Sequence, residues 1–304
     1  MNPAQDSPRV LAVVVMYDSH EEVERCVRSV LGQTLAGLEV LVVDNGSRDG
    51  SGNRIRARFA EEPRVRVAGL SPYRGCSGGA NAGFALALER GPAFVWLLTD
   101  DVELEPRAAE HLLQAMEADE RVGLAGQYIL HRDQRDRIYY GGGLFTKKGA
   151  VHEHRDEAIQ PGQDPGPARD TDYATGASMF WRASALAKVG GMDESFWLYW
   201  EDADLSHRAR AAGWKVVVVP RALAWHDVTP GDDPSMPLRT RYSARNELRF
   251  LRKHGLASPW AKARRMLLRG LRRRLFRGDR LAAAAAKGAL DFLLGRSGPI
   301  KGRW

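Results

Sequence analysis

The 304-residue chain has few of the features that mark secreted or membrane-spanning proteins. Its two cysteines, Cys26 and Cys76, are too few for a disulfide framework and lack the spacing of a metal site. No run approaches the ~20 apolar residues needed to cross a bilayer. The first ten residues, MNPAQDSPRV, are too polar for a secretory signal. We therefore expect a folded protein of the cytoplasm.

Two glycine signatures of nucleotide-binding proteins are also missing. A dinucleotide-binding fold needs glycines directly after its first strand, but the corresponding turn here reads MYDSHEE, residues 16–22. The P-loop pattern GxxxxGK[ST] does not occur in the chain. The sequence thus argues against a NAD site of the usual kind and against a P-loop nucleotidase.

Charge is distributed unevenly along the chain. Residues 241–304 hold 18 Lys and Arg against 3 Asp and Glu, a net charge of +15. The remaining 27 basic and 35 acidic residues give residues 1–240 a net charge of −8. Such a basic segment predicts an anionic partner, either a membrane or a nucleic acid. We place the boundary between a main domain, 1–237, and a basic helical extension, 238–304.

Buried-strand patterns alternate with helical patterns through the first third of the chain. The short β-branched runs predict strands, and the segments between them have helical spacing. This alternation predicts an α/β fold with a mixed, mainly parallel sheet flanked by helices. The expected strands are 9–17, 38–47, 64–69 and 93–99, and the expected helices are 20–33, 49–61 and 80–90.

The pattern continues with less regularity. Residues 105–127 predict a helix and a strand, 171–181 a strand and 201–214 a helix with an acidic first turn. The segment 152–170 is rich in proline, glycine and charge, which is typical of a loop. From about residue 238 onward the pattern is helical and basic.

Acidic residues follow several of the expected strands. Ligands of parallel α/β sheets bind beyond the carboxyl ends of the strands, so Asp18, Asp44, Asp100 and Asp101 should lie at one edge. Tyr17 could stack on a base there, although Asp44-Asn45-Gly46 by itself is an ordinary turn sequence. The segment YRGCSGGANAG, residues 73–83, predicts a glycine-rich loop that enters a helix and approaches a phosphate.

The order of these motifs resembles a known family. VVVMYDS, VVDNGSRDGS, GGANAG, LLTDDVELEP, GASMFW, WLYWEDADLSHRARAAGW and VPRALAWH follow one another between about residues 9 and 250. This series is similar to the family 2 glycosyltransferases of the GT-A fold, in particular to the bacterial rhamnosyltransferase-like branch. The resemblance implies an inverting enzyme that transfers a sugar from a nucleotide-sugar donor.

The resemblance also implies roles for individual residues. Asp101, in the Thr99-Asp100-Asp101 triplet at the family's DXD position, and His226 would hold a divalent metal, Mn²⁺ or Mg²⁺. Thr99 and Asp18 depart from the usual family residues at their positions. The nucleotide-sugar side would be formed by Tyr17, Asp18, Asp44, Asn45, Gly75, Gly78, Gly79, Asn81, Asp100 and Arg245.

By the same resemblance, Asp202 would be the catalytic base, with Glu201 as the second candidate. A carboxylate near the acceptor hydroxyl can remove its proton as the oxygen attacks the anomeric carbon. Both acids could equally serve as favourable charge in a helix first turn. Trp197, Tyr199 and Trp200 could stack on the acceptor or donor sugar, or could belong to the core.

The extension contains a basic amphipathic pattern over residues 258–277, with arginines between the apolar positions 260, 263, 267, 268, 271 and 275. This pattern is typical of a helix at an anionic membrane surface. An alternative packs Leu267, Leu271 and Leu275 on the catalytic domain, and we expect some of both. No nucleic-acid-reading motif accompanies the charge, so we expect no nucleic-acid partner.

Our best prediction is transfer of rhamnose from dTDP-rhamnose to a glycan or lipid-linked acceptor at the inner membrane face. UDP- and GDP-sugars stay open as donors, loop 152–170 is a candidate acceptor determinant, and the oligomeric state, including a dimer, stays open. The alternatives are a nucleotidyltransferase on a related fold and a degenerate sugar-binding or scaffold protein.

Overall fold

The apolar runs of the sequence form the strands of one large sheet in the computed structural model, which describes residues 8–146, 149–160, 164–227 and 233–300. The side chains of 149–152 and 274–277 are also outside the description. Within the described residues, ten strands join this sheet and two form a hairpin. The strands are β1 Val10–Met16, β2 Leu38–Asp44, β3 Val65–Gly69, β4 Phe94–Thr99, β5 Val102–Leu104, β6 Val122–His131, β7 Ile138–Tyr140, β8 Gly143–Thr146, β9 Gly149–His152, β10 Arg169–Asp170, β11 Ser178–Arg182 and β12 Lys215–His226.

The first four strands are parallel and closely in register, as predicted. The sheet order is β10-β12-β6-β11-β4-β1-β2-β3. Met16 lies opposite Asp44, and Val15 lies opposite Thr99. The carboxyl ends of β1, β2 and β4 therefore finish at one level, and the turns that follow them share one edge of the sheet.

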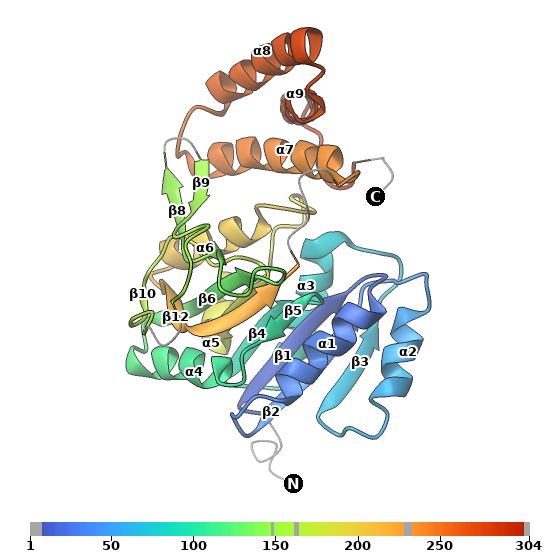
Figure 1. Ribbon diagram of the computed structural model, residues 1–304, viewed down its shortest axis with the longest axis vertical. Coiled ribbons are helices and arrows are strands. Elements are labelled where there is room, and N and C mark those ends of the chain that lie inside the picture. The colour runs from blue at the N-terminus through green and yellow to red at the C-terminus, as the bar shows by residue number, and fades with distance from the viewer. Residues whose placement is uncertain (1–7, 147–148, 161–163, 228–232, 301–304) are drawn as a thin grey trace.

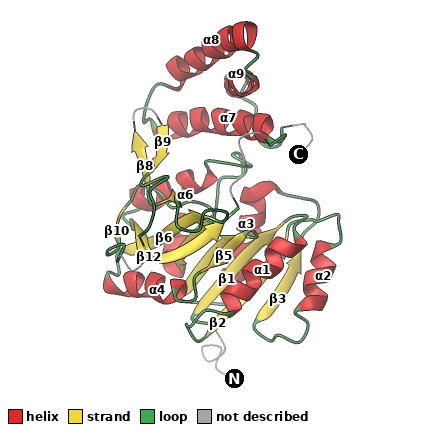
Figure 2. Ribbon diagram, viewed as in Figure 1, coloured by secondary structure: helices red, strands yellow, loops and turns green. Residues whose placement is uncertain are grey.

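Helices cover both faces of the sheet (Figures 1 and 2). Even-numbered residues of β1, such as Val10 and Val14, pack toward α1, α2 and α4, whereas Leu11 and Val13 pack toward α3, α5 and α6. Burial on both faces explains why the strands read as continuous apolar runs. These helices are α1 His20–Leu31, α2 Ser51–Arg58, α3 Gly75–Glu89, α4 Ala108–Ala118, α5 Ala183–Val189 and α6 Glu201–Ala211.

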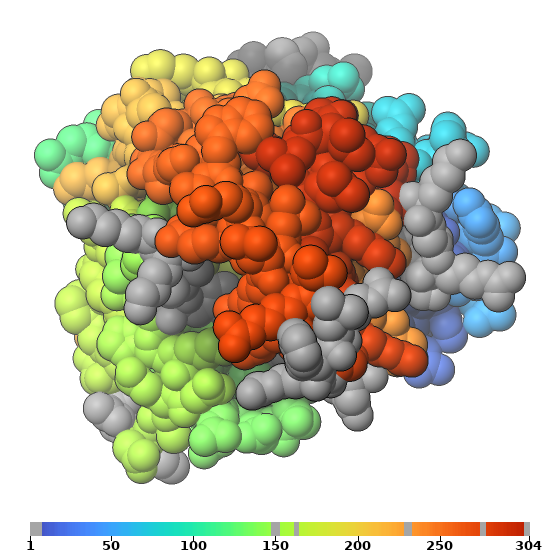
Figure 3. Space-filling view, turned by 90° about the horizontal axis from the view of Figure 1, so that it is seen from above, coloured from blue at the N-terminus to red at the C-terminus, as the bar shows by residue number. Residues whose placement is uncertain are grey.

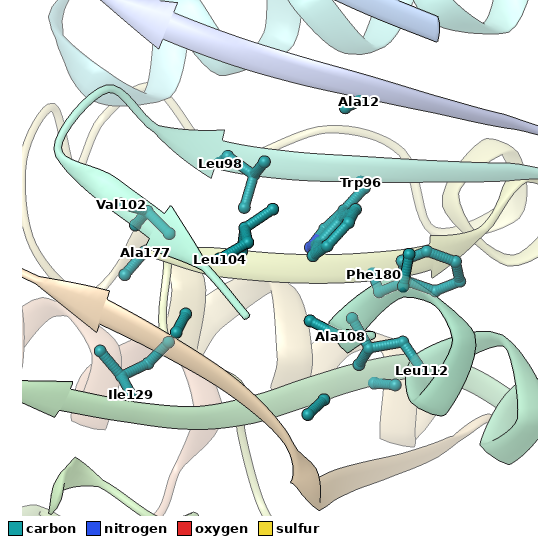
Figure 4. Close-up of a cluster of buried hydrophobic side chains, with 14 of the residues drawn as sticks. Ala12, Trp96, Leu98, Val102, Leu104, Ala108, Leu112, Ile129, Ala177 and Phe180 are labelled. Carbon is teal, nitrogen blue, oxygen red and sulfur yellow. The ribbon is translucent and has the colours of Figure 1, made fainter. Parts of the chain in front are cut away.

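The sheet becomes mixed on one side of β4. Strand β11 lies antiparallel between β4 and β6, and β6 pairs in parallel with β12. Figure 4 shows the core here, where Trp96, Leu98 and Phe180 from β4 and β11 meet Leu112 of α4. The predicted strand 171–181 is confirmed only in its second half, because β11 begins at Ser178.

One local expectation is wrong. The glycine-rich segment is not a loop that precedes a helix, because α3 already begins at Gly75. A Cβ at Gly83 would lie 2.4 Å from Val13 Cγ1, so the glycines bring this helix close to the sheet.

The Asp100-Asp101 turn leads into another strand. Strand β5 comes next and pairs antiparallel with β12, with Val102 opposite His226.

The basic extension consists of α7 Met236–His254, α8 Pro259–Arg277 and α9 Arg280–Leu293, stacked at one end of the molecule (Figure 1). No described helix is long and apolar enough to cross a membrane. Leu267 packs within the extension rather than on the catalytic domain, and Leu271 is 61% exposed. The packing that the sequence predicted for Leu271 is therefore wrong, and the Leu275 side chain lies outside the described residues.

A buried carboxylate joins the extension to the main domain. Asp204 of α6 is fully buried, and its oxygens contact Arg208 Nε at 2.9 Å and both Lys253 Nζ and His254 Nε2 at 2.8 Å. Lys253 and His254 end α7. The acidic first turn of α6 thus includes one residue whose function is to hold two elements together.

We expect Asp204→Ala to destabilise the protein by up to about 3 kcal/mol, because it removes the carboxylate partner of Arg208 and one of the two carboxylate partners of Lys253. Urea unfolding would measure the change. Asp119→Ala is the control, since Asp119 pairs with Arg121 and Lys215 at the surface, where pairs contribute little. Equal effects of the two substitutions would contradict this role of Asp204.

Candidate functional site

Hydrogen bonds connect the turns that follow β1, β2 and β4. Asp100 Oδ2 accepts from the Tyr17 amide at 3.4 Å and from the Ser19 hydroxyl. The Asp18 amide donates to Ser47 Oγ at 3.1 Å, and Asp18 Oδ1 accepts from the Arg48 amide at 2.7 Å. The structure therefore brings together three of the predicted turns, and Asp18 uses the positive φ of 50° at its position to span two of them.

Asp44 ends β2 and closes the second turn. Its Oδ1 accepts from the Ser47 amide at 2.9 Å. A Cβ at Gly52 would lie 1.8 Å from Asp44 Oδ2, so the carboxylate extends over the first turn of α2 and requires glycine there. The residue is only half-buried, which leaves it accessible from the edge of the sheet.

Several residues predicted on the nucleotide side have their polar groups occupied within the protein. Buried Asn45 donates to the Gly75 carbonyl at 2.9 Å and accepts from the Arg74 amide at 3.2 Å. Asn81 binds both backbone groups of Met192. These side chains fix the start of α3 and the loop before α6.

The glycines of α3 admit neighbouring protein groups. A Cβ at Gly75 would lie 2.6 Å from the Trp197 ring, one at Gly78 2.6 Å from Arg74 Cβ, and one at Gly79 2.6 Å from Asn45 Nδ2. Glycine is thus required at these three positions, because any larger side chain would collide with a neighbouring protein group.

Asp101 and His226 form a pair at the junction of β5 and β12. His226 Nε2 lies 3.1 Å from Asp101 Oδ2, and Thr99 Oγ1 donates to Asp101 Oδ1 at 2.8 Å. Burial alone would raise the pKa of Asp101 and lower that of His226. The attraction between the two outweighs burial, so the pKa of Asp101 is lowered and that of His226 is raised.

The donor set of this pair fits a divalent cation. Adjacent ligands of an octahedral ion with bonds of about 2.1 Å lie about 3 Å apart, as the Asp101 and His226 atoms do. Within the described residues, no group of three or more His, Cys, Asp or Glu side chains could hold a metal. The remaining ligands would therefore come from water or from a bound molecule.

Asp100 differs from its neighbour in charge. Burial, followed by the nearby Asp101 carboxylate, raises the pKa of Asp100 to about 7. Its hydrogen bonds to Ser19 and Tyr17 direct it toward α1 rather than toward His226. Asp100 therefore braces the turn after β1, while Asp101 remains ionised beside His226.

The loop before α6 is held in an unusual backbone conformation. Trp197, Tyr199 and Trp200 have φ values of 65°, 67° and 74°, which are costly for side chains of this size. Asn246 of α7 compensates, because its Nδ2 lies 2.6–3.0 Å from the carbonyl oxygens of Phe196, Leu198 and Tyr199. The extension thus fixes the loop that presents Glu201 and Asp202.

Glu201 and Asp202 have different surroundings at the start of α6. Asp202 Oδ2 accepts from the Gly176 amide and Oδ1 from the Ala203 amide, both at 2.8 Å. Glu201 Oε2 is buried without a hydrogen-bond partner among the described residues. Burial and the neighbouring Asp202 raise the pKa of Glu201 to about 8. Burial also raises the pKa of Asp202, but its hydrogen bonds from the Gly176 and Ala203 amides act in the opposite direction and favour its ionised form.

The aromatic residues before Glu201 do not act as one group. The Trp197 ring meets Tyr73 edge-on at 5.8 Å, and Tyr73 lies 4.2 Å from Tyr17. Tyr199 accepts a hydrogen bond from Arg239, whereas Trp200 packs on Phe250 at 5.1 Å. Trp197 therefore lies near the predicted nucleotide side, and Trp200 contributes to packing against α7.

Arg245 is enclosed by protein. It is 1% exposed, donates to Asn246 Oδ1 at 3.0 Å and lies 5.0 Å above the Tyr242 ring. Burial lowers the pKa of its guanidinium to about 10. Arg245 thus supports Asn246.

Arg239 is the arginine that sequence reasoning missed. Half-buried on α7, it donates to Tyr199 Oη at 2.9 Å and to Ser235 Oγ at 2.8 Å. Burial raises the pKa of the Tyr139 hydroxyl, and the negative charges of Asp202 and Asp101 raise it further. The positive charge of Arg239 lowers this pKa. In the sequence Arg239 is one of four arginines within residues 239–249, and nothing there separates it from the other three.

Comparison with known proteins identifies the family. Residues 11–187 match the family model described as Glycosyl transferase family 2. The chain is a family 2 glycosyltransferase. It is 29% identical over 266 residues to an N-acetylglucosaminyl-diphospho-decaprenol L-rhamnosyltransferase of Mycobacterium tuberculosis, covering 76% of this chain and 81% of the relative.

Solved structures share the fold of this glycosyltransferase. The mannosyltransferase PcManGT from Pyrobaculum calidifontis, in complex with GDP-Man and Mn²⁺, aligns with a TM-score of 0.62 and 16% identity, covering 95% of this chain and 88% of that one. GalNAc-T7 with UDP, GalNAc and Mn²⁺ aligns with a TM-score of 0.60 and 14% identity. That alignment covers 78% of this chain but only 48% of GalNAc-T7. The predicted GT-A fold is confirmed.

Glu201 predicts a pH-dependent stability. Its pKa is about 8 in the folded state and 4.5 ordinarily, so its contribution is present below about pH 4.5 and lost as the pH rises through about 8. Glu201→Gln should reduce the pH dependence of the free energy of unfolding, because each unit of pKa shift corresponds to about 1.4 kcal/mol. Urea unfolding between about pH 5 and 8 measures it. Exposed Glu61→Gln should keep the original slope, and an unchanged slope in Glu201→Gln would refute the assignment.

Proposed function

We propose that this glycosyltransferase inverts the anomeric centre of a nucleotide-activated sugar as it transfers that sugar to an acceptor hydroxyl. The observation that carries the proposal is the convergence of two unlike acidic pairs. Asp101 with His226, and Asp202 with Glu201, come from distant segments, yet consecutive residues connect them. Asp202 accepts from the Gly176 amide at 2.8 Å, and the carbonyl of the next residue, Ala177, accepts from the Thr99 amide at 3.2 Å. A metal-binding pair and a carboxylate base near each other are the parts that such a transfer requires.

Asp101 Oδ2 and His226 Nε2 would hold the metal. Bound there, Mn²⁺ or Mg²⁺ supplies positive charge to the diphosphate oxygens as the leaving group becomes more negative. An imidazole ligand favours Mn²⁺ over Mg²⁺. Thr99 keeps Asp101 oriented by donating to its other oxygen.

Asp202 would act as the base. Its two backbone hydrogen bonds hold the carboxylate in place, while burial raises its pKa above the ordinary value and improves its basicity. The acceptor oxygen forms the new bond to the anomeric carbon, the bond to the diphosphate breaks, and the acceptor proton moves to Asp202. Glu201, already protonated, adds no second negative charge.

Arg239 would complete the charge balance. The diphosphate leaves as an anion, and a fixed guanidinium stabilises that charge without reorganisation of solvent. Tyr199 and Ser235 hold this guanidinium in place, and no carboxylate within the described residues forms an ion pair with it. Arg239 thus takes the role that the sequence resemblance suggested for Arg245.

The donor and acceptor are proposed by analogy with the relative named above. Its name describes L-rhamnosyl transfer and N-acetylglucosaminyl-diphospho-decaprenol, which supports rhamnose as the sugar and a glycan or lipid-linked acceptor for this chain. Our proposed donor is dTDP-rhamnose, and our proposed location is the inner face of the cell membrane. The turns containing Tyr17, Asp18 and Asp44 would receive the nucleoside. The basic extension would face the anionic membrane. The family match argues against the two alternatives, a nucleotidyltransferase and a scaffold protein.

A donor panel tests the proposal. With Mn²⁺ present, we expect the protein to bind and slowly hydrolyse one of dTDP-rhamnose, UDP-sugars or GDP-sugars, measured as nucleotide release, and to stop when the metal is chelated. Asp202→Asn keeps the shape of the side chain but not its basicity. It should lower transfer by about 10²–10⁴-fold and leave donor binding by calorimetry intact. An Asp202→Asn variant with full activity would place the base elsewhere.

Arg239→Ala should lower kcat by about 10²–10³-fold, since it removes a preorganised positive charge from the leaving group. Arg239→Lys should restore part of the loss. Arg252→Ala provides the control, because Arg252 is exposed near the end of the same helix. Steady-state kinetics with the donor found above gives kcat. If Arg239→Ala and Arg252→Ala behave alike, Arg239 has no such role.

A further inference from the structure

Helix α8 presents an apolar stripe to solvent. Trp260 is 55% exposed, and Leu268 and Leu271 are each 61% exposed. At 100° per residue these three positions fall within roughly 80° of the helix circumference. Large apolar side chains rarely gather in this way on the surface of a soluble protein unless the surface binds something.

Arginines accompany the stripe. Arg264 lies within it, and Arg265, Arg269 and Arg272 follow along one flank, all exposed. None of the four forms an ion pair in the described part of the chain. Their charge is therefore available to a partner, in a segment that carries much of the +15 net charge of residues 241–304.

The two leucines of the stripe, Leu268 and Leu271, are not part of the packed cluster within the extension. The adjoining side of α8 contacts its neighbours through Ala263, Met266 and Leu267. A Cβ at Gly270 would lie 2.4 Å from Ala286 Cβ, so α8 and α9 approach closely there. Seen from that end, the helices of the extension spread across the molecular face (Figure 3). The ring of Phe292 in α9 lies 5.3 Å from that of Trp260. Nearby in the chain, Leu290, Leu293 and Leu294 are exposed and add apolar surface.

We propose that this outer face of α8, together with the exposed end of α9, docks on an anionic lipid bilayer. Leucines and a tryptophan among arginines match the boundary between acyl chains and anionic headgroups, where both kinds of side chain are satisfied. A nucleic acid would account for the arginines but not for the leucines. A second copy of the chain would account for the leucines, but a symmetric contact would place the arginines against one another.

Docking would orient the catalytic site. Helix α7 carries Arg239 and Asn246 at the site, and Gly288 of α9 packs against it, since a Cβ there would lie 2.3 Å from the Arg241 carbonyl oxygen. The lipid-facing helix and the site thus belong to one packed unit. Docking would therefore place the site close to lipid-linked acceptors in the membrane. That consequence rests on the proposed function, whereas the docking itself does not.

Vesicle binding by the full chain tests the inference. We expect sedimentation with phosphatidylcholine vesicles that contain phosphatidylglycerol but not with phosphatidylcholine alone, and quenching of Trp260 by brominated acyl chains that is lost in Trp260→Phe. Arg265→Gln/Arg269→Gln should bind on the order of tenfold more weakly. Arg54→Gln/Arg66→Gln removes equal charge from an exposed region of the main domain and should bind normally.

Leu268→Ser/Leu271→Ser should also bind on the order of tenfold more weakly, with unchanged thermal unfolding because both leucines are exposed. Normal binding by this variant, or equal binding to neutral vesicles, would overturn the inference. So would a dimer in solution that this variant abolishes without any vesicle binding. Nucleotide release is measured separately in the absence of vesicles, so failure of docking and failure of the proposed function give different results.

Discussion

The in-register parallel pairing of β1 with β2 and β4 is the constraint on which the site depends. Because Met16, Asp44 and Thr99 end their strands at one level, the turns that follow these strands lie side by side although they are far apart in the chain. The backbone ladder and burial on both faces enforce this register, since a shift of one residue would reverse every side chain. The chemistry at the edge is thus a consequence of the packing below it.

Buried acids in this protein differ according to their partners. Asp204 contacts Arg208, Lys253 and His254 and joins two elements. Asp101 has His226 and stays ionised, whereas Asp100 and Glu201 have mainly burial and a neighbouring carboxylate, which raise their pKa values. Asp100 and Glu201 therefore retain a proton to higher pH than Asp101, which has a cationic partner. The retained proton lets two carboxyl groups lie side by side without full repulsion.

The extension contacts the candidate site and also carries the proposed membrane-binding face. Through Asn246 it holds a loop with three positive φ values, and through Arg239 it reaches Tyr199 beside the acids. Its outer helix meanwhile leaves leucines and arginines without partners inside the described protein. A single helical unit thus connects the candidate site to the exposed face of α8, across the boundary predicted near residue 237.

From the sequence alone, the strands, the parallel edge and the family could be predicted, because alternation of apolar runs and local motifs are properties of short segments. The pairing of Asp101 with His226 was predicted from the family resemblance, but its cause, the antiparallel β5, was not visible. Only the tertiary structure decided that Asn45 and Arg245 are enclosed by protein, that Arg239 reaches the site, and that Leu271 faces solvent. Each of these outcomes depends on contacts between segments that are far apart in the chain, and the residues next to a position in the sequence do not indicate such contacts.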